Sequence, residues 1–249
     1  RHVVFAGKGA LALHGREVAR AAEAAGREAR GSATVCGGTP ALELLGAAFR
    51  GDAVERIEGV LNGSTSFVLS RLEEGDAWDQ AIAEARRLGY LEADPSLDLL
   101  GLDAAAKAVI LANAAWGLGL TLADAKAQGV MGVTAAEARQ AKERGLAIRL
   151  VARASPGLGV AVAPVALPRD HPLVTDGPEN ALRLKLRDAG AITLRGRGAG
   201  GRETAAAVLS DILAISDIIE ISNPVTLNGT PEKASAAPRR AAPLPGAGR

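Results

Sequence analysis

Cysteine, aromatic and histidine residues are scarce in this sequence, and their scarcity excludes several classes of protein. Cys36 is the only cysteine among 249 residues, so the chain has neither an internal disulfide nor a multi-thiolate metal site. Aromatic residues make up 2% of the chain, which leaves few side chains to stack on single-stranded nucleic acid. The three histidines lie far apart in sequence, so their spacing does not indicate a metal site.

The net charge is also small, and the apolar runs are short. A formal net charge of +1 gives no electrostatic reason to expect binding to nucleic acid or to an anionic membrane. Gly, Lys or Asp interrupts each apolar stretch well before the ~20 residues of a membrane-spanning helix. The first five residues lack the apolar core of a secretory signal. We therefore expect a soluble cytoplasmic protein that has neither a membrane partner nor a nucleic-acid partner.

What the chain does contain is enough apolar residues for one substantial core or two small ones, at 48% of the composition. Hydrophobic periodicity alternates between the two regular structures and predicts an α/β or α+β domain with a mixed sheet. Strands are predicted at 28–36, 54–60, 147–154, 160–167, 181–186 and 191–194. Helices are predicted at 8–25, 40–49, 64–73, 78–88, 103–118, from 134 onward, and at 203–220.

The most informative stretch for function is residues 89–107. Glu92, Asp94, Asp98, Asp103 and Lys107 fall within it, on a Gly- and Pro-containing loop that leads into an apolar helix. Asp103 and Lys107 stand four positions apart, so they share one helix face and can pair. Such a cluster suits a small zwitterionic substrate, because carboxylates hold an amine while the ammonium donates to an oxygen. The alternative is a solvated loop beside a surface ion pair, worth roughly 0.3–0.5 kcal/mol.

The same stretch resembles the substrate-binding signature of homoserine dehydrogenases. The family pattern is Gly-Tyr-x-Glu-x-Asp-Pro-x-x-Asp-x-x-Gly-x-Asp-x-x-x-Lys, and residues 89–107 fill every fixed position. Residues 59–67 are similar to the family segment Gly-Ile-Leu-Asn-Gly-Thr-Thr-Asn-Tyr, and residues 196–205 resemble its Gly-x-Gly-Ala-Gly…Thr-Ala motif. Residues 3–8 are a degraded version of Val-Val-Thr-Ala-Asn-Lys. These matches occur in family order along most of the chain.

This resemblance implies an NAD(P)-dependent enzyme that interconverts L-homoserine and L-aspartate 4-semialdehyde in threonine and methionine biosynthesis. It implies a mixed-sheet catalytic and dimerisation domain covered by helices, at residues 31–222, and a homodimer. Residues 1–30 would be the remnant of a Rossmann-type nucleotide-binding domain and its junction. Residues 223–249 are rich in Pro, Ala, Gly and Arg, a composition that predicts a disordered tail.

The nucleotide-binding half is the part of the family pattern that is largely missing. Residues 7–12, Gly-Lys-Gly-Ala-Leu-Ala, come close to the Gly-x-Gly-x-x-Gly turn of dinucleotide-binding domains. However, a complete half needs on the order of 100 residues, and the next segments match the substrate domain instead. The resemblance therefore implies that most of this half is absent, together with the residue after its second strand that selects NAD or NADP.

The resemblance also assigns roles to individual residues. Lys107 matches the proposed acid–base lysine, and Lys8 matches a second lysine near the nicotinamide and the substrate. A lysine pKa near ~10.4 is high for this task, so burial or crowding should lower it. Asp98 is expected to orient Lys107. The resemblance implies substrate contacts from Ser64, Gly89, Tyr90, Glu92, Asp98 and Asp103, and cofactor contacts from Ala6, Lys8 and Gly200.

A monovalent cation such as sodium is a further expectation from the family. The segment 32–40 looks like the one that binds the cation through a Glu side chain and backbone carbonyls, but Ser32 stands where that Glu is usual. A hard-cation site loses its only charged ligand by this change. The carbonyls of Val35, Gly37 and Thr39 remain as weak ligands, while Cys36 is expected to be a small buried residue.

Two further hypotheses remain beside the enzyme. The chain could be a non-catalytic remnant that folds and dimerises without binding the dinucleotide, which the missing nucleotide-binding half favours. Phe5 and Gly7 also favour it, because they replace the polar Thr and Asn expected near the nicotinamide. Alternatively, the chain could be a dehydrogenase of similar fold acting on another amino-acid semialdehyde. The combination of Glu92, Asp103 and Lys107 favours an enzyme, since a purely structural domain does not need it.

Overall fold

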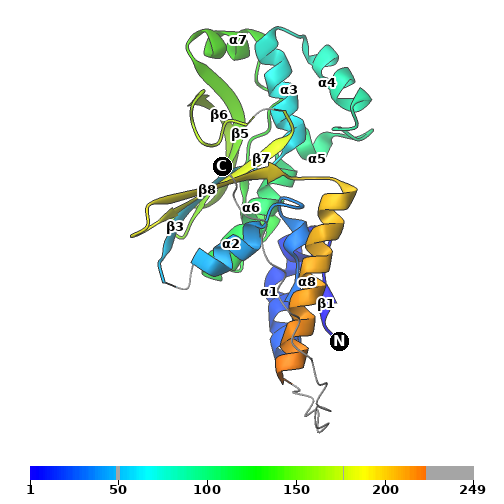
Figure 1. The fold of residues 1–249 in the computed structure, drawn as a ribbon. Helices are drawn as coiled ribbons and strands as arrows, with labels where there is room; N and C mark the ends of the chain where they lie inside the picture. The colour runs from blue at the N-terminus through cyan, green and yellow to red at the C-terminus, as the bar shows by residue number, and fades with distance from the viewer. Residues whose placement is uncertain (49–50, 176, 223–249) are drawn as a thin grey trace, which may run out of the picture.

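A six-stranded mixed sheet forms the centre of the computed structural model, which describes residues 1–48, 51–175 and 177–222 (Figure 1). The strands lie in the order β4-β6-β5-β3-β7-β8. β4 pairs parallel with β6, and the other neighbours pair antiparallel, which confirms the predicted mixed sheet. The bounds are β3 Val54–Val60, β4 Lys126–Ala127, β5 Leu146–Ser155, β6 Gly159–Pro168, β7 Glu179–Leu186 and β8 Ala191–Arg197.

Helices cover one face of this sheet. α6 (Leu102–Trp116) packs across β3, β5 and β6, and α3 (Gly63–Glu74) packs on β5 and β7. α7 (Ala135–Glu143) and α4 (Trp78–Arg87) lie beside α3 at the top of Figure 1. The short helix α5 (Ser96–Leu99) immediately precedes α6 and packs against it. α6 therefore begins next to α5 and runs along the middle strands of the sheet.

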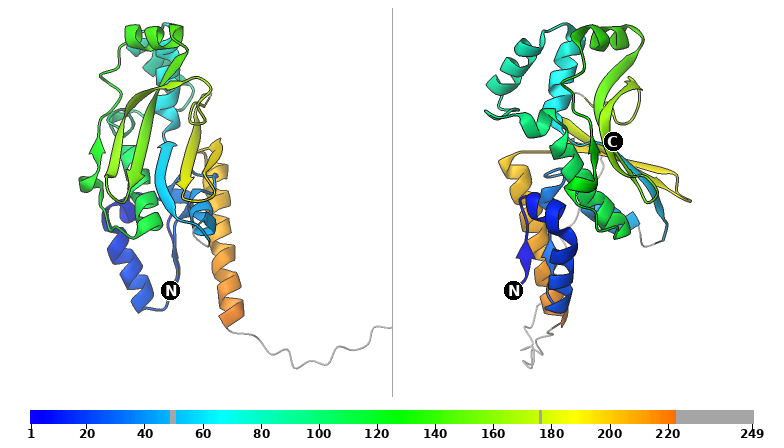
Figure 2. Two further views of the ribbon diagram at one scale, coloured as in Figure 1. Left: turned by 90° about the vertical axis from the view of Figure 1, so that its left-hand side faces the viewer. Right: turned by 180° about the vertical axis from the view of Figure 1, so that it is seen from behind.

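The first and last elements of the described chain lie together below the sheet. β1 (Val3–Val4) and β2 (Ala29–Arg30) form a two-stranded parallel sheet, and α1 (Gly9–Ala24) connects them. α1 and α8 (Gly201–Ser222) project downward on either side of these strands (Figure 2, left). The remaining elements are the helix α2 (Ala41–Ala48) and two 3-10 helices, η1 (Ser32–Thr34) and η2 (Leu122–Asp124).

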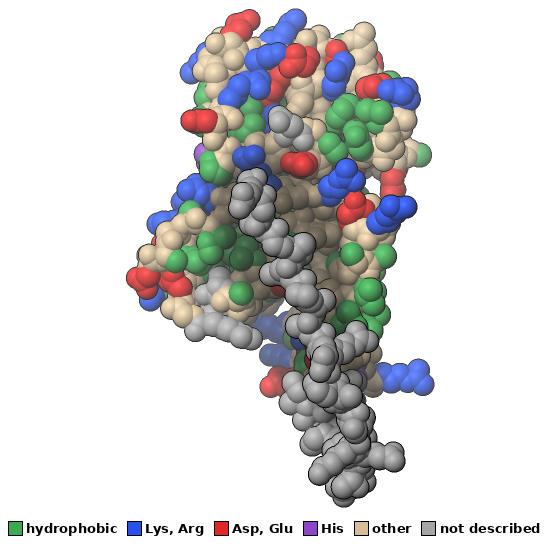
Figure 3. Space-filling view, in the orientation of Figure 1, with side chains coloured by type: hydrophobic (Ala, Val, Ile, Leu, Met, Phe, Trp, Pro, Cys, Tyr) green, Lys and Arg blue, Asp and Glu red, His purple; other side chains and the backbone are tan. Residues whose placement is uncertain are grey.

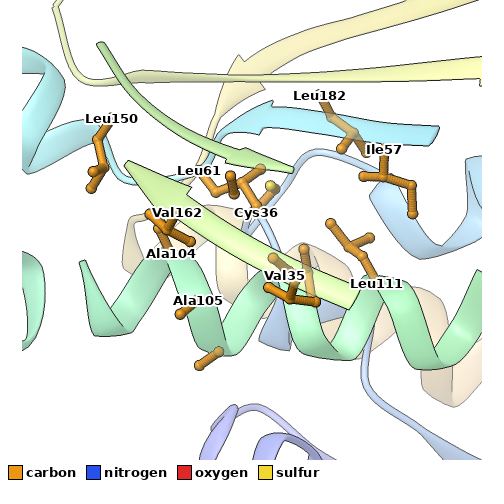
Figure 4. Packing of buried hydrophobic residues seen from close by; sticks show 14 of the residues in the cluster. Val35, Cys36, Ile57, Leu61, Ala104, Ala105, Leu111, Leu150, Val162 and Leu182 are labelled. Carbon is orange, nitrogen blue, oxygen red and sulfur yellow. The ribbon is translucent and has the colours of Figure 1, made fainter. Parts of the chain in front are cut away.

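The main core fills the space between the sheet and its helices (Figure 4). Leu111 of α6 faces Ile57 of β3 and Leu182 of β7, and all three side chains are fully buried. A smaller cluster forms from Val60, Val151, Leu167, Leu173 and Ala181. Among the described residues, no helix is long and apolar enough to cross a lipid bilayer. On the surface drawn in Figure 3, basic and acidic side chains are interspersed.

Most predicted elements are present, but the prediction of a strand at 28–36 was wrong. The predicted strand at 28–36 is only two residues long, and the 3-10 helix η1 follows it. Polar side chains explain the difference, because the Thr34 hydroxyl donates to the carbonyl of Gly31 and the backbone N–H of Ser32 donates to the carboxylate of Asp211. The predicted tail at 223–249 lies outside the described residues, as does residue 49 at the end of one predicted helix.

Candidate active site

The site is centred on a carboxylate that lies between two lysines. Asp103 lies in the first turn of α6, and its two oxygens contact Lys8 Nζ at 2.8 Å and Lys107 Nζ at 2.9 Å. Lys8 immediately precedes α1, so the N-terminal segment supplies half of this arrangement. The side chain of Lys107 is 12% exposed and that of Lys8 is 37% exposed. The predicted pairing of Asp103 with Lys107 is confirmed, and Lys8 joins the same carboxylate.

The two ammonium groups decide the charge of Asp103. Burial raises the pKa of a carboxyl, because a charged group loses its hydration. Here the charge and hydrogen bonds of Lys107 and Lys8 outweigh burial and lower the pKa of Asp103 to about 2. The carboxylate is therefore ionised at any pH at which the protein would work. Its negative charge offsets part of the charge of the two lysines within one cavity.

Lys107 has a second fixed contact outside its own helix. Its Nζ donates to the carbonyl of Leu61 at 2.7 Å, where β3 turns into α3. The same carbonyl accepts a hydrogen bond from Asn180 Nδ2 of β7 at 3.3 Å. Asn180 is 2% exposed, and its Oδ1 has no hydrogen-bond partner within the described residues. The position of Lys107 therefore depends on residues from α6, the β3–α3 turn and β7.

Asn62 is a residue of this site that sequence reasoning missed. Its Nδ2 donates to Asp98 Oδ1 at 2.6 Å and to Asp103 Oδ2 at 2.9 Å, and the residue is 4% exposed. Its Oδ1 accepts from the backbone N–H of Thr65 at 2.8 Å, which makes Asn62 the N-cap of α3. The sequence carries a signal for the cap, since Asn precedes a helical pattern, but no signal for the two carboxylates.

Asp98 lies on the helix α5, not on a loop as expected. The structure gives it no hydrogen bond to Lys107, and its carboxylate accepts from Asn62 instead. Burial raises the pKa of Asp98 above its usual range, and the neighbouring charge of Asp103 adds to this effect. The Asn62 hydrogen bond, together with the charges of the two lysines, acts in the opposite direction. A role in orienting Lys107 stays a prediction, and it would have to act through Asn62.

A cavity of about 580 Å³ brings the predicted site residues together. The Ser64 hydroxyl donates to the backbone carbonyl of Tyr90 at 2.5 Å, and the Tyr90 ring packs on Phe67 with centroids 5.0 Å apart. Glu92 is exposed at the cavity rim, whereas Asp94 does not line the cavity and bonds Ser96. Every residue assigned to the substrate or the dinucleotide lines this cavity, namely Ala6, Lys8, Ser64, Gly89, Tyr90, Glu92, Asp98, Asp103, Lys107 and Gly200.

The glycine-rich turn before α8 forms another wall of the cavity. Gly198 lies against the amide of Asn180 so closely that a Cβ at this position would overlap it. Gly200 has a φ of 132°, which side chains rarely allow, and its carbonyl accepts the first hydrogen bond of α8 from Thr204. Gly198 and Gly200 therefore expose their backbone to the cavity, because they have no side chains to cover it. A flat or anionic ligand group can approach such a backbone closely.

The segment expected to hold a cation has other contacts. The Ser32 hydroxyl donates to Asp211 Oδ1 of α8 at 2.7 Å, and the carbonyl of Thr39 accepts from the N–H of Ala41 at 2.7 Å. Of the three residues whose carbonyls were expected to bind the cation, only Gly37 lines the cavity. The part of the chain that the structure describes has no group of three or more His, Cys, Asp or Glu residues placed for a metal ion. Cation binding therefore stays a prediction.

Cys36 is buried as expected, at 1% exposure (Figure 4). Burial raises the pKa of its thiol, although the neighbouring charge of Lys107 acts in the opposite direction. The residue has a φ of 59°, which is uncommon for a side chain other than glycine. It also lies in the cavity wall next to Gly37. The raised pKa keeps the thiol protonated, so it behaves as a small packing residue.

Comparison with known protein families agrees with this geometry. The family model described as homoserine dehydrogenase matches residues 40–213, which is more than half of the chain. The chain belongs to the homoserine dehydrogenase family. The match includes the acid cluster, Lys107 and the glycine-rich turn, whereas Lys8 lies before it. In this chain the two lysines therefore come from two parts of the sequence. Lys107 belongs to the matched domain, and Lys8 belongs to the segment that precedes it.

Individual relatives in the homoserine dehydrogenase family support the assignment. The homoserine dehydrogenase of Methanocaldococcus jannaschii is 38% identical over 216 residues, which are 86% of this chain and 64% of that protein. The NAD(+)-dependent homoserine dehydrogenase of Pseudomonas canavaninivorans is 36% identical over 220 residues, which are 86% of this chain and 62% of that protein. The chain spans between about half and two thirds of the length of the curated relatives it matches.

Solved structures of the homoserine dehydrogenase family have the same fold. The enzyme of Thiobacillus denitrificans matches with a TM-score of 0.85 and 33% identity, covering 90% of this chain and 53% of that chain. A hyperthermophilic archaeal homoserine dehydrogenase in complex with NADPH matches with a TM-score of 0.79 and 34% identity, covering 87% of this chain and 64% of that chain. The mixed-sheet fold is thus the fold of this family.

Proposed function

We propose that this protein is an NAD(P)-dependent oxidoreductase that interconverts L-homoserine and L-aspartate 4-semialdehyde. The observation that carries the proposal is the position of Asp103 between Lys8 and Lys107 in the wall of one cavity. Two lysines and an ionised carboxylate have no structural need to converge beside a cavity. They are the groups that an amino-acid alcohol and a hydride acceptor require.

The cavity offers complementary groups to the two ends of such a substrate. The ammonium of homoserine is suited to the carboxylates of Glu92 and Asp98, which line the cavity. The hydroxyl is suited to Lys107, whose Nζ is held by Asp103 and by the carbonyl of Leu61. During oxidation the hydroxyl loses its proton while hydride leaves the same carbon, and Lys107 in its neutral amine form is placed to accept that proton and become the ammonium that pairs with Asp103. In the reverse direction Lys107 returns the proton to the carbonyl oxygen.

NAD or NADP is the cofactor that we propose. When bound, its nicotinamide accepts the hydride. The residues fit such a group, because the turn with Gly198 and Gly200 presents bare backbone to the cavity where a Cβ would be excluded. Ala6 and Lys8 line the same cavity from the N-terminal segment. Among the relatives, one is named as NAD(+)-dependent and a solved structure is a complex with NADPH, and an assay with both dinucleotides distinguishes the two cofactors.

Further properties of the family extend the proposal. We expect a homodimer in the cytoplasm, taking part in threonine and methionine biosynthesis. A weak sodium site at the carbonyls of Val35, Gly37 and Thr39 also belongs to the proposal. Sedimentation of the purified protein tests the dimer, and the dependence of activity on sodium at constant ionic strength tests the cation.

The decisive experiment measures homoserine-dependent reduction of NAD+ and NADP+ by the purified protein, expressed with any sequence that its gene encodes before Arg1. Lys107→Ala is assayed beside it, and Lys142→Ala serves as a matched control. Lys142 lies on α7 and pairs with Glu74 on the surface, away from the cavity. Loss of a positioned acid–base group should lower kcat by roughly 10²–10⁴-fold, whereas the control should retain normal rates.

Other outcomes distinguish the competing hypotheses. No homoserine-dependent absorbance change with either dinucleotide in the unsubstituted protein would refute the proposal. Oxidation of a different amino-acid alcohol under the same conditions, abolished by Lys107→Ala, would identify a dehydrogenase with another substrate. Failure of the folded protein to bind either dinucleotide in a fluorescence titration would favour the non-catalytic remnant.

A further inference from the structure

We propose that Asn62 is a positioning residue that holds Asp98 and Asp103 at a fixed separation and thereby sets the geometry of the acid–lysine cluster. The inference rests on the proposed function and deepens it. It starts from one amide nitrogen that donates to two carboxylates on two different helices, at 2.6 Å to Asp98 and 2.9 Å to Asp103. Asn62 is 4% exposed and lines the cavity, so solvent does not substitute for these bonds.

Two carboxylates this close together need a donor between them. Like charges repel strongly when solvent is excluded, and the repulsion falls when both accept hydrogen bonds from one group. Asp103 also has Lys8 and Lys107 as partners. Within the described residues, the carboxylate of Asp98 has only Asn62 as a hydrogen-bond donor. Loss of the amide would therefore leave the carboxylate of Asp98 without a hydrogen-bond donor beside the charge of Asp103.

The other end of Asn62 is fixed, and this makes the amide a rigid spacer. Its Oδ1 accepts from the N–H of Thr65 at 2.8 Å, at the N-terminus of α3. Its backbone carbonyl accepts from the hydroxyls of Thr65 and Ser66 at 3.0 and 3.1 Å. With the oxygen committed to the helix cap, the nitrogen is directed at the two carboxylates. The start of α3 thus fixes the position of Asp103, which in turn holds both lysines.

A purely structural role as a helix cap is the competing explanation, and two variants separate it from positioning. Asn62→Ser keeps a good N-cap residue, but its shorter side chain has no amide that reaches both carboxylates. Asn62→Asp keeps both the cap and the shape, but adds a third carboxylate where a donor is needed. Thr134→Ala is the matched control, because Thr134 caps α7 through Glu137 far from the cavity.

The experiment compares these variants in the full-length protein by homoserine kinetics across pH and by thermal unfolding. For Asn62→Ser and Asn62→Asp we expect kcat/KM for homoserine to fall on the order of tenfold to a hundredfold, since misplaced catalytic groups cost rates of this size. The KM for the dinucleotide should change less than the KM for homoserine. The acid limb of the Asn62→Asp profile should move to higher pH, because Asp98 and Asp103 gain a negative neighbour beside Lys8 and Lys107. Thr134→Ala should change the melting temperature but not the pH profile.

Normal kcat/KM and an unchanged pH profile in Asn62→Ser would overturn the proposal and leave Asn62 as a helix cap only. If the unsubstituted protein does not oxidise homoserine, the proposed function fails, and the positioning role is still tested by carboxyl-carbon NMR. In that measurement the titration of Asp98 should move to higher pH in both Asn62 variants. An unmoved titration would overturn the positioning role by itself.

Discussion

Lys107 binds Asp103 across a single turn of α6, with Lys107 Nζ 2.9 Å from Asp103 Oδ2. The other oxygen of Asp103 is 2.8 Å from Lys8 Nζ, so one carboxylate restrains two ammonium groups from distant parts of the chain. Lys107 has a second restraint in the carbonyl of Leu61, whereas the ammonium of Lys8 has no other hydrogen bond or ion pair within the described residues. Asp103 is therefore the residue on which the geometry of both lysines depends.

The Asp103→Asn variant should lose activity more severely than a change at Lys8. An amide cannot neutralise the two ammonium groups, so Lys8 and Lys107 would repel each other and separate. We expect kcat/KM for homoserine to fall by about 100-fold or more, because displacement of catalytic groups by about 1 Å has an effect of this size. Steady-state kinetics of Asp103→Asn and Lys8→Ala check the ranking. Equal or smaller losses in Asp103→Asn would show that the carboxylate does not position both lysines.

The pKa of Asp103 predicts a specific dependence of stability on pH. The folded-state pKa is about 2, below the unfolded value near ~3.9, so the ionised form stabilises the folded state. This contribution is fully present above about pH 4 and is lost as pH falls toward 2, and it amounts to about 2–3 kcal/mol. Urea unfolding of the natural protein and of Asp103→Asn at several pH values checks this. The difference between their free energies of unfolding should shrink below pH 4, and parallel curves would contradict the assignment.

The glycine-rich turn predicts a different kind of defect. Gly198→Ala would place a methyl group on the amide of Asn180, and overpacking of this type costs about 1–3 kcal/mol. The turn would shift, so the KM for the dinucleotide should rise more than the KM for homoserine. Gly132→Ala is the control, because a Cβ there meets no atom within 4 Å. Similar KM values for the two variants would show that the close approach of Gly198 and Asn180 does not shape the cofactor side.

Elements with a strong local pattern were predictable from the sequence. The strand Val54–Val60 has apolar residues at Val54, Ile57 and Val60, and all three are buried. The helix after Thr134 begins with the predicted capping box, in which Thr134 and Glu137 bind each other reciprocally. The i, i+4 pair of Asp103 and Lys107 also formed as expected. In each case the signal and its partner lie within a few residues, so local geometry decides the outcome.

Contacts between distant segments could not be predicted in the same way. Ser32 and Asp211 are 179 positions apart, and their hydrogen bonds replace most of the predicted strand at 28–36 with a 3-10 helix. Asn180 and Leu61 are 119 positions apart, and nothing in either local pattern indicates that they meet. The convergence of the acid cluster on one cavity was predicted through the family resemblance. The double hydrogen bond of Asn62 depends on how α5 and α6 pack, which periodicity does not specify.

A buried ion pair outside the cavity gives a prediction on stability alone. Glu73 of α3 and Arg149 of β5 are each 3% exposed and lie 2.6 Å apart, and Arg169 binds the second oxygen of Glu73 at 2.8 Å. Glu73→Ala would leave the Arg149 guanidinium buried without a counter-charge, a change that typically costs about 3–5 kcal/mol. The neighbouring variant Glu74→Ala is the matched control, because Glu74 and Lys142 form an exposed pair that solvent screens.

Urea unfolding should therefore show a large loss in Glu73→Ala and almost none in Glu74→Ala, although the two residues are adjacent in sequence. Both variants should keep normal kcat and KM well below the unfolding temperature, because neither side chain lines the cavity. A marked fall in kcat of Glu73→Ala at low temperature would show that the α3–β5 contact also transmits strain to Asn62 at the start of α3. Equal free energies of unfolding in the two variants would mean that water or a rearranged partner compensates Arg149, contrary to the burial of this pair.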